Sequence, residues 1–263
     1  MTDNDICRKF RELAIKAGEK ILEIYDRDEL QVDSKADDSP VTEADRIADT
    51  LIHAGLSEAF PGVPIVTEEK SSTHSIKAKT FFIVDPLDGT KEFIHRRGDF
   101  TVNIAYVVEG VPVLGVVYAP AKSRLFMTKP GGGALEELGP FDPEKAGDCY
   151  SVSTAPPKDT DLAVVASKSH RDQATDDYIA KYSVGDFKAA GSSLKFCLLA
   201  TGEADLYPRL GRTMEWDTAA GQAVLMAAGG FVVDFETREP LYYGKSGFSN
   251  PFFIAASNGT KLR

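Results

Sequence analysis

The chain has 263 residues, of which 43% are hydrophobic, and carries a formal net charge of −10. This length fits one large unit or two fused ones, and the apolar content is enough for a sizeable core. The acidity, with no long run of Lys or Arg, excludes nucleic acid as the main partner, because phosphate backbones attract basic stripes. A small anionic substrate is not excluded, because a few placed cations or metal ions can bind it.

Cysteine spacing and apolar runs indicate the cellular compartment of the protein. Cys7, Cys149 and Cys197 are widely spaced and form no C-x-x-C pair, which argues against a disulfide framework or a structural zinc site. The first residues lack the pattern of a signal peptide, and no run of about 18 apolar residues could span a membrane. We therefore expect a cytoplasmic protein; peripheral contact with the inner membrane and the oligomeric state stay open.

The first half of the chain mixes helix and strand patterns. Apolar residues at steps of three or four predict a helix from Ile6 to Ile24, and the polar segment from Asp33 to Pro40 indicates a mobile loop. A second helix is predicted to begin at Thr42, with Asp45 completing a capping box. Two β-branched runs that flank Gly110 predict a hairpin. Strands are expected at 63–66, 81–84, 100–109, 111–118 and 124–128, the last leading to a glycine turn at 131–133.

The second half alternates between strands and helices. Strands are predicted at 162–166, 204–207, 231–235 and 252–256, and helices at 172–182, 192–200 and 218–228. We therefore expect an α+β fold, a layered sandwich of helices and two mixed sheets that forms one compact unit. The sheets are expected in an N-terminal part, about 1–145, and a C-terminal part, about 146–263.

The densest chemical signal is the string D-P-L-D-G-T-K-E at 85–92. We expect a buried strand to end at Asp85, because Pro86 cannot continue a ladder, and the following turn to bring Asp88 back beside Asp85. Two carboxylates with the Leu87 carbonyl between them offer the oxygen ligands that Mg²⁺ prefers. Gly89 removes a side chain where a phosphate must approach, and a helix starting there would point free N–H groups at that phosphate.

Each acidic residue also has a plainer interpretation. The D-x-x-D spacing alone is typical of a polar turn, and Glu68 and Glu69 could form a solvated acidic loop. Asp217 could simply cap the helix that it precedes. Several acids at strand ends and helix starts favour a metal site more strongly than any single one, because buried carboxylates need a counter-charge. If the two short strands are parallel neighbours, Glu68 lies near Asp85.

Two strings carry a resemblance to a known family. D-P-L-D-G-T at 85–90 and W-D-T-A-A-G at 216–221 closely resemble the two signature motifs of the inositol monophosphatase superfamily, which comprises lithium-sensitive, Mg²⁺-dependent phosphatases. The resemblance extends to 40–45, 67–69 and 191–195, and so covers nearly the whole chain. It is strongest to the bacterial 3′(2′),5′-bisphosphate nucleotidase branch, whose members hydrolyse 3′-phosphoadenosine 5′-phosphate to AMP in sulfur assimilation and nucleotide recycling.

The resemblance implies a role for each matching residue and a layered family fold. Glu68, Asp85 and the Leu87 carbonyl would hold the first of two or three Mg²⁺ ions, and Asp85, Asp88 and Asp217 the second. Asp45 would help to hold a third ion. Thr90 with Glu68 would position the attacking water, and the Gly89 and Thr90 backbone would bind the scissile phosphate. The family motif selects Glu68 over Glu69.

Phosphoryl transfer is consistent with these groups, because it needs positioning and charge neutralisation more than a covalent partner. A nucleophile elbow G-x-S-x-G is absent from the sequence.

Residues of the second half indicate which phosphate ester is cleaved. Inositol phosphatases place a carboxylate before the W-D string to bind ring hydroxyls, whereas this chain has Arg209 there. Lys195 matches a basic position of nucleotidases, and the two cations suit a second phosphate. Both could instead be solvated surface charges. By resemblance, His170 and Ser192 would contact the nucleotide, although a lone histidine has many structural roles.

Two alternatives remain at this point. The nearer one is an inositol monophosphatase or fructose-1,6-bisphosphatase with the same metal core. The more distant one is a non-catalytic regulatory protein stabilised by metal, although Thr90 beside an intact ligand set argues against it.

Overall fold

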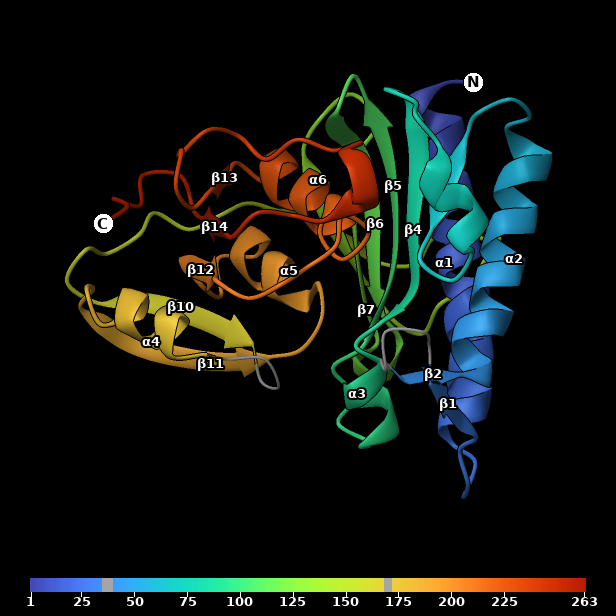
Figure 1. The fold of residues 1–263 in the computed structure, drawn as a ribbon, viewed down its shortest axis with the longest axis horizontal. Helices are drawn as coiled ribbons and strands as arrows, with labels where there is room; N and C mark the ends of the chain where they lie inside the picture. Colours follow the sequence, from blue (N-terminus) through green and yellow to red (C-terminus); the bar gives the residue numbers. More distant parts are fainter. Residues whose placement is uncertain (35–39, 168–171) are drawn as a thin grey trace.

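The computed structural model describes residues 1–34, 40–167 and 172–263. Two mixed sheets and layers of helices build the fold (Figure 1), as the sequence predicts. One sheet has seven strands in the order β3-β4-β5-β6-β7-β8-β9, and the other has five in the order β11-β10-β12-β14-β13. Three hydrophobic clusters fill the spaces between the layers.

The outer helices α1 (Asp3–Tyr25) and α2 (Glu43–Ala59) cover one face of the seven-stranded sheet. The buried apolar stripe of α1 packs there, and a Thr42–Asp45 capping box starts α2, as predicted. The predicted loop from Asp33 to Pro40 is wrong at its two ends. Its ends form a two-stranded ladder of β1 (Val32–Ser34) and β2 (Pro40–Thr42), and 35–39 lie outside the described residues.

The strands of the seven-stranded sheet follow the predicted runs closely in its centre. Its members are β3 (Ile65–Thr67), β4 (Phe81–Asp88), β5 (Thr101–Val108), β6 (Val111–Ala119), β7 (Arg124–Thr128), β8 (Ala134–Leu138) and β9 (Cys149–Val152). Strands β8 and β9 were not predicted from the sequence, and β9 lies beyond residue 145. The short helix α3 (Thr90–Ile94) follows β4 at the end of the sheet.

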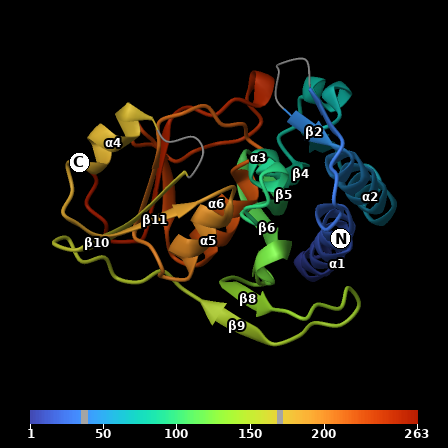
Figure 2. The same ribbon diagram turned by 90° about the horizontal axis from the view of Figure 1, so that it is seen from below.

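Helices α5 (Leu194–Ala200) and α6 (Ala219–Ala227) lie between the two sheets, and α4 (Gln173–Ile179) covers the outer face of the second sheet (Figures 1 and 2). All three are shorter than predicted. The second sheet contains β10 (Leu162–Ser167), β11 (Val184–Ala190), β12 (Leu206–Arg209), β13 (Phe231–Asp234) and β14 (Phe253–Ala256). Strand β11 was not predicted, because most of its residues are exposed and show no alternation.

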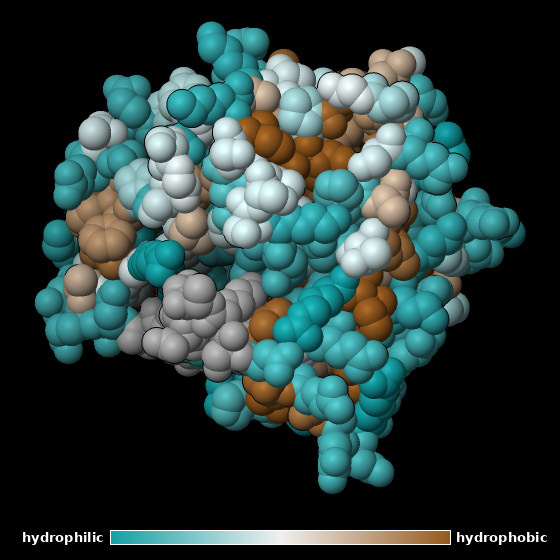
Figure 3. Space-filling view, turned by 45° about the vertical axis from the view of Figure 1, so that its right-hand side comes forward, coloured by the Kyte–Doolittle hydropathy of each residue, from teal (hydrophilic) through white to brown (hydrophobic). Residues whose placement is uncertain are grey.

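The layers therefore run helix, sheet, helix, sheet, helix, with the two sheets converging on α5 and α6. The visible face in Figure 3 is mostly hydrophilic, with hydrophobic residues in separate small patches. None of the helices in the described part of the chain combines the length and the apolar character that crossing a membrane requires.

Candidate active site

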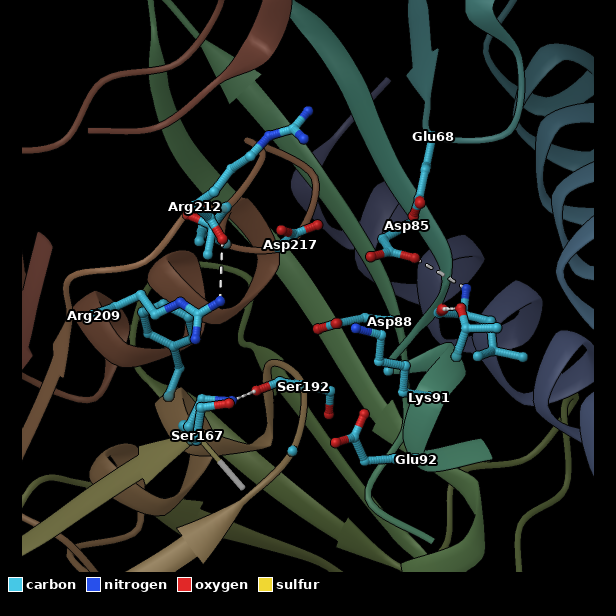
Figure 4. Close-up of a pocket in the computed structure, with 18 of the residues that line it drawn as sticks. Glu68, Asp85, Asp88, Lys91, Glu92, Ser167, Ser192, Arg209, Arg212 and Asp217 are labelled. Carbon is cyan, nitrogen blue, oxygen red and sulfur yellow. Dashed lines mark hydrogen bonds between the residues drawn. The ribbon is translucent and has the colours of Figure 1, made fainter. Parts of the chain in front are cut away.

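A pocket opens where the ends of β3 and β4 face β12, α5 and the loop before α6. We call the part of its lining formed by Glu68, Asp85, Asp88 and Asp217 the acidic end, and the part formed by Lys195 of α5 and Arg209 of β12 the basic end. Figure 4 shows the carboxylates of Glu68, Asp85 and Asp217 directed toward a common space, with Arg209 across the pocket. Apart from Asp217, the acidic residues come from the first half of the chain, whereas Lys195 and Arg209 come from the second.

Three carboxylates form a compact acidic cluster. Glu68, Asp85 and Asp217 each offer an oxygen atom within 4.8 Å of the others. Strands β3 and β4 are parallel neighbours, with Thr67 opposite Val84, so Glu68 lies beside Asp85 as the sequence predicted. Such oxygen ligands on one concave surface fit Mg²⁺, which binds few carboxylates and keeps room for water and phosphate oxygens. Among the described residues, this cluster contains Glu68 and not Glu69.

The strand carrying Asp85 does not end there, contrary to the prediction. Strand β4 continues to Asp88, but its pairing with β5 is irregular between Asp85 and Asp88. Pro86 lies in this irregular stretch, where no regular ladder bond is required of it. The Leu87 N–H donates to Asp85 Oδ1 at 3.1 Å, which fixes the turn and leaves the Leu87 carbonyl near Thr90.

Asp88 is held by donors from two other elements. Its Oδ2 accepts the Ser193 N–H at 2.7 Å and the Asn103 Nδ2 at 3.3 Å. Burial raises the pKa of Asp88 to about 6, against the opposing effects of the nearby Lys195 ammonium and the Ser193 bonds. Asp88 therefore lies in the same pocket as the acidic cluster, with one oxygen tied to the protein.

Asp217 does not cap the following helix. Thr218 is the N-cap of α6, and Asp217 Oδ2 instead accepts the Met214 N–H at 2.8 Å. Burial raises the pKa of Asp217 well above its usual range, and the nearby charges of Asp88 and Glu68 add to the shift. A bound cation would stabilise the charged forms of these enclosed acids.

Thr90 and Asp45 are joined at the edge of this pocket. Thr90 Oγ1 lies 3.1 Å from Asp45 Oδ1, to which it donates, and 3.4 Å from the Leu87 carbonyl. Asp45 Oδ2 simultaneously accepts the Thr42 N–H, so its capping role is confirmed. Gly89 has φ of +94°, and a Cβ there would meet the Asp99 carbonyl at 3.1 Å, so this turn requires glycine.

The two predicted cations are buried, so interpreting them as solvated surface charges was wrong. Lys195 is 4% exposed, and its Nζ donates to the Ser192 carbonyl at 2.6 Å. Burial lowers the pKa of Lys195 to about 8, and the Asp88 charge opposes this shift. Arg209 is 9% exposed, and its Nη2 donates to the Arg212 carbonyl at 3.1 Å. Buried cations at a pocket wall are suited to an anionic ligand.

Other predicted and unpredicted residues complete the pocket. Ser192 lines it, with φ of +47° and a buried Oγ that has no hydrogen-bond partner among the described residues. His170 lies outside the described residues. Sequence analysis missed several lining side chains: Lys91, Glu92, Ser167, Phe196, Tyr207, Arg212 and Thr213. Tyr207 could have been found, because it lies two residues before Arg209 on one strand and so faces the same side.

Comparison with known proteins identifies the family. A model of the inositol monophosphatase family matches residues 4–258. The chain belongs to this family. It is 43% identical to the 3′(2′),5′-bisphosphate nucleotidase CysQ of Escherichia coli K12 over 92% of this chain and 96% of that protein. It is 40% identical to the protein of the same name from Buchnera aphidicola, covering 88% and 86% of the two chains.

Solved structures agree with this assignment. The crystal structure of CysQ from Bacteroides thetaiotaomicron superposes with a TM-score of 0.85 at 41% identity, covering 99% of both chains. SuhB from Bartonella henselae gives a TM-score of 0.75 at 28% identity, covering 95% of this chain and 92% of that one. The fold prediction is confirmed, and the chain is a phosphatase of the inositol monophosphatase family.

Proposed function

We propose that this enzyme hydrolyses the 3′-phosphate of a 3′,5′-bisphosphorylated nucleotide, converting 3′-phosphoadenosine 5′-phosphate to AMP and phosphate. The observation that carries the proposal is a single pocket that holds an acidic cluster, with the buried Arg209 across from it and the buried Lys195 near both Asp88 and Arg209. Two oppositely charged ends suit a substrate with one phosphate at the metals and a second phosphate farther away. The relatives named as nucleotidases support the same substrate class. The proposed setting is nucleotide recycling during sulfur assimilation in the cytoplasm.

The proposed metal centre uses the acidic residues already described. Glu68, Asp85 and the Leu87 carbonyl would hold one Mg²⁺, and Asp85, Asp88 and Asp217 a second. Asp45 would contribute to a third. The fit is supported by the three carboxylates within 4.8 Å of one another and by the raised pKa of Asp217. When bound, Mg²⁺ would neutralise the phosphate oxygens and make water a better nucleophile.

Side chains and backbone groups of the chain would then orient the reacting groups. Thr90 Oγ1 donates to Asp45, so its lone pairs can accept a hydrogen bond from a water in the pocket and help to orient it. Glu68, on the other side of the acidic cluster, would orient the same water. Gly89 lets the phosphate approach the N-terminus of α3, where the backbone N–H groups of the turn are available. No covalent intermediate is required.

The basic end would recognise the remainder of the nucleotide. Lys195 and Arg209 would bind the 5′-phosphate, and Ser192 Oγ, buried without a hydrogen-bond partner among the described residues, would gain one from the substrate. His170 would also contact the nucleotide. We further propose a division of labour: residues 1–145 carry most metal ligands, and residues 146–263 carry the specificity residues and Asp217.

Phosphate release tests this proposal directly. Purified protein would be assayed with 3′-phosphoadenosine 5′-phosphate, inositol 1-phosphate and fructose 1,6-bisphosphate, each with Mg²⁺ and with a chelator. We expect Mg²⁺-dependent release and the highest kcat/KM on the nucleotide. A preference for inositol 1-phosphate would refute the nucleotidase proposal while leaving the metal centre intact. Equal release with and without the chelator would refute the metal centre.

Lithium provides a second test of the metal centre. Li⁺ is close to Mg²⁺ in size but carries half its charge, so it can occupy an oxygen-ligand site after catalysis. Product phosphate would then leave the site slowly. We expect inhibition in the millimolar range or below when Mg²⁺ is limiting. A velocity that Li⁺ does not change would argue against the assigned ligands.

A further inference from the structure

A helical turn contacts the residues that directly precede two acids of the cluster, Glu68 and Asp217. The 3₁₀-helix η1 (Ser71–Ser75) folds back onto the residue that precedes Glu68. Its His74 Nε2 lies 2.9 Å from the Thr67 carbonyl and donates to it, since a carbonyl can only accept. Thr73 Oγ1 accepts the Thr67 N–H at 3.2 Å. Both polar groups of the Thr67 backbone are therefore bound by η1.

The other face of His74 reaches the loop that carries Asp217. Its imidazole stacks on the indole of Trp216, with ring centroids 4.8 Å apart and an interplanar angle of 23°. Phe248 flanks both rings, at 6.2 Å from His74 and 6.1 Å from Trp216. Trp216 is 6% exposed and directly precedes Asp217.

The stack thus joins two segments that come from opposite halves of the chain. Glu68 follows Thr67 and Asp217 follows Trp216, and these two carboxylates belong to one cluster with Asp85. Like charges at such short range repel one another, so a cation site of this kind needs contacts that hold its ligands together before the cation arrives. A planar stack between rigid rings with few rotatable bonds suits that task.

We propose that His74 is a positioning residue of the metal centre, which sets the distance between Glu68 and Asp217 through its bond to Thr67 and its stack on Trp216. This inference rests on the metal centre of the proposed function. His74 does not need to touch metal or substrate in this role. It acts on the affinity for the ion and not on the chemical step.

Three substitutions separate the two contacts. His74→Phe keeps a ring for the stack and removes the donor to Thr67. His74→Gln keeps an N–H near the Nε2 position and removes the ring. His74→Ala removes both. Tyr182→Ala is the matched control, because Tyr182 also belongs to an aromatic pair, with Tyr178 at 5.4 Å, but lies beside α4 on the outer face of the second sheet.

The readout is metal binding without substrate or turnover. Mn²⁺, which prefers the same oxygen ligands, would be titrated into chelator-treated protein while electron paramagnetic resonance measures the free ion. We expect His74→Ala to weaken binding by about 10-fold, in the range for residues that orient metal ligands. His74→Phe and His74→Gln should each weaken it by about 3-fold, the share of one aromatic or hydrogen-bond contact. Tyr182→Ala should leave it unchanged.

Two further measurements distinguish positioning from general stability. At saturating Mg²⁺ the kcat of His74→Ala should stay within about twofold of wild type, because the chemical groups are intact. Trp216 is the only tryptophan in the sequence, so its fluorescence reports this stack alone and should change in His74→Ala and His74→Gln.

Wild-type Mn²⁺ affinity in His74→Ala would overturn the inference, as would an equal loss in Tyr182→Ala. A wild-type protein that binds no Mn²⁺ would instead refute the metal centre itself.

Discussion

The acidic and basic ends of the pocket are built in different ways. Asp85 and Asp88 lie in one irregular stretch of β4, which is held locally by the bond from Leu87 to Asp85 and by the turn at Gly89. Lys195 and Arg209 come from α5 and β12, and only the packing of the second sheet brings them together. Both ends gather like charges, which burial makes costly. Each end therefore suits a ligand of the opposite charge, and in the proposed function these ligands are a cation at one end and a phosphate at the other.

The largest effect is expected at the acidic end. Asp88→Asn keeps the size of the side chain and deletes one charge of the proposed metal centre. We expect a folded protein whose kcat/KM falls by about 100- to 1,000-fold, because stabilisation of transition-state charge is lost. Asp159→Asn is the control, since Asp159 is exposed and pairs with Lys261.

Phosphate release at saturating Mg²⁺ would measure both variants, with melting temperature as the check on folding. Turnover of Asp88→Asn near the wild-type rate would contradict the importance assigned to the acidic end.

An intermediate effect is expected at the basic end, and only for one substrate. A charge-assisted hydrogen bond contributes about 1.5–3 kcal/mol, which corresponds to about 10- to 150-fold in kcat/KM. Arg209→Ala should lose this much on 3′-phosphoadenosine 5′-phosphate and little on 3′-AMP, which has no 5′-phosphate. Arg238→Ala, which removes a guanidinium stacked on Phe235, should change neither.

Equal losses of Arg209→Ala on the two substrates would mean that Arg209 supports the fold or the metal end. The proposed separation between the two ends would then be wrong.

The smallest effect concerns pH. Burial lowers the pKa of Lys195 to about 8, so its ammonium is charged at pH 7 and loses its proton as the pH rises through that value. The kcat/KM for the bisphosphate should therefore fall between pH 7 and pH 9 by up to about 10-fold, since one pH unit above the pKa leaves about a tenth of the lysine charged.

The matching profile for 3′-AMP should lack this decline. Parallel profiles for the two substrates would assign the ionisation to the shared acidic end instead of Lys195.

The sequence predicted the acidic end better than the basic one, for a physical reason. The D-P-L-D-G-T string brings Asp85 and Asp88 to the same pocket, although Asp88 lies outside the compact cluster of Glu68, Asp85 and Asp217. The expected nearness of Glu68 to Asp85 depended on parallel pairing of two short apolar runs, and β3 and β4 do pair in parallel. The predicted end of β4 at Asp85 was wrong, because a strand can continue through Pro86 where its pairing becomes irregular.

The burial of Lys195 and Arg209 could not be read from the sequence alone. A lysine on a short helix and an arginine at the end of a strand are usually exposed, and only packing between distant elements encloses them. The same limit applies to Ser193 and Asn103, which hold Asp88 from α5 and β5. Their contacts span about 15 to 105 positions along the chain, beyond any local pattern.

The adjacent residues Ser192 and Ser193 constrain how the specificity of this enzyme could change. The Ser192 carbonyl accepts Lys195 Nζ, while the Ser193 N–H binds Asp88 and its hydroxyl donates to the Asp217 carbonyl at 2.6 Å. The peptide unit that joins these two serines therefore contacts both the proposed recognition cation, through its carbonyl, and a proposed metal ligand, through its N–H. Redesign of the substrate range would disturb catalysis if it began at this dipeptide. Strand β12 offers a more independent place to begin, because it contributes Tyr207 and Arg209 to the pocket from the second sheet.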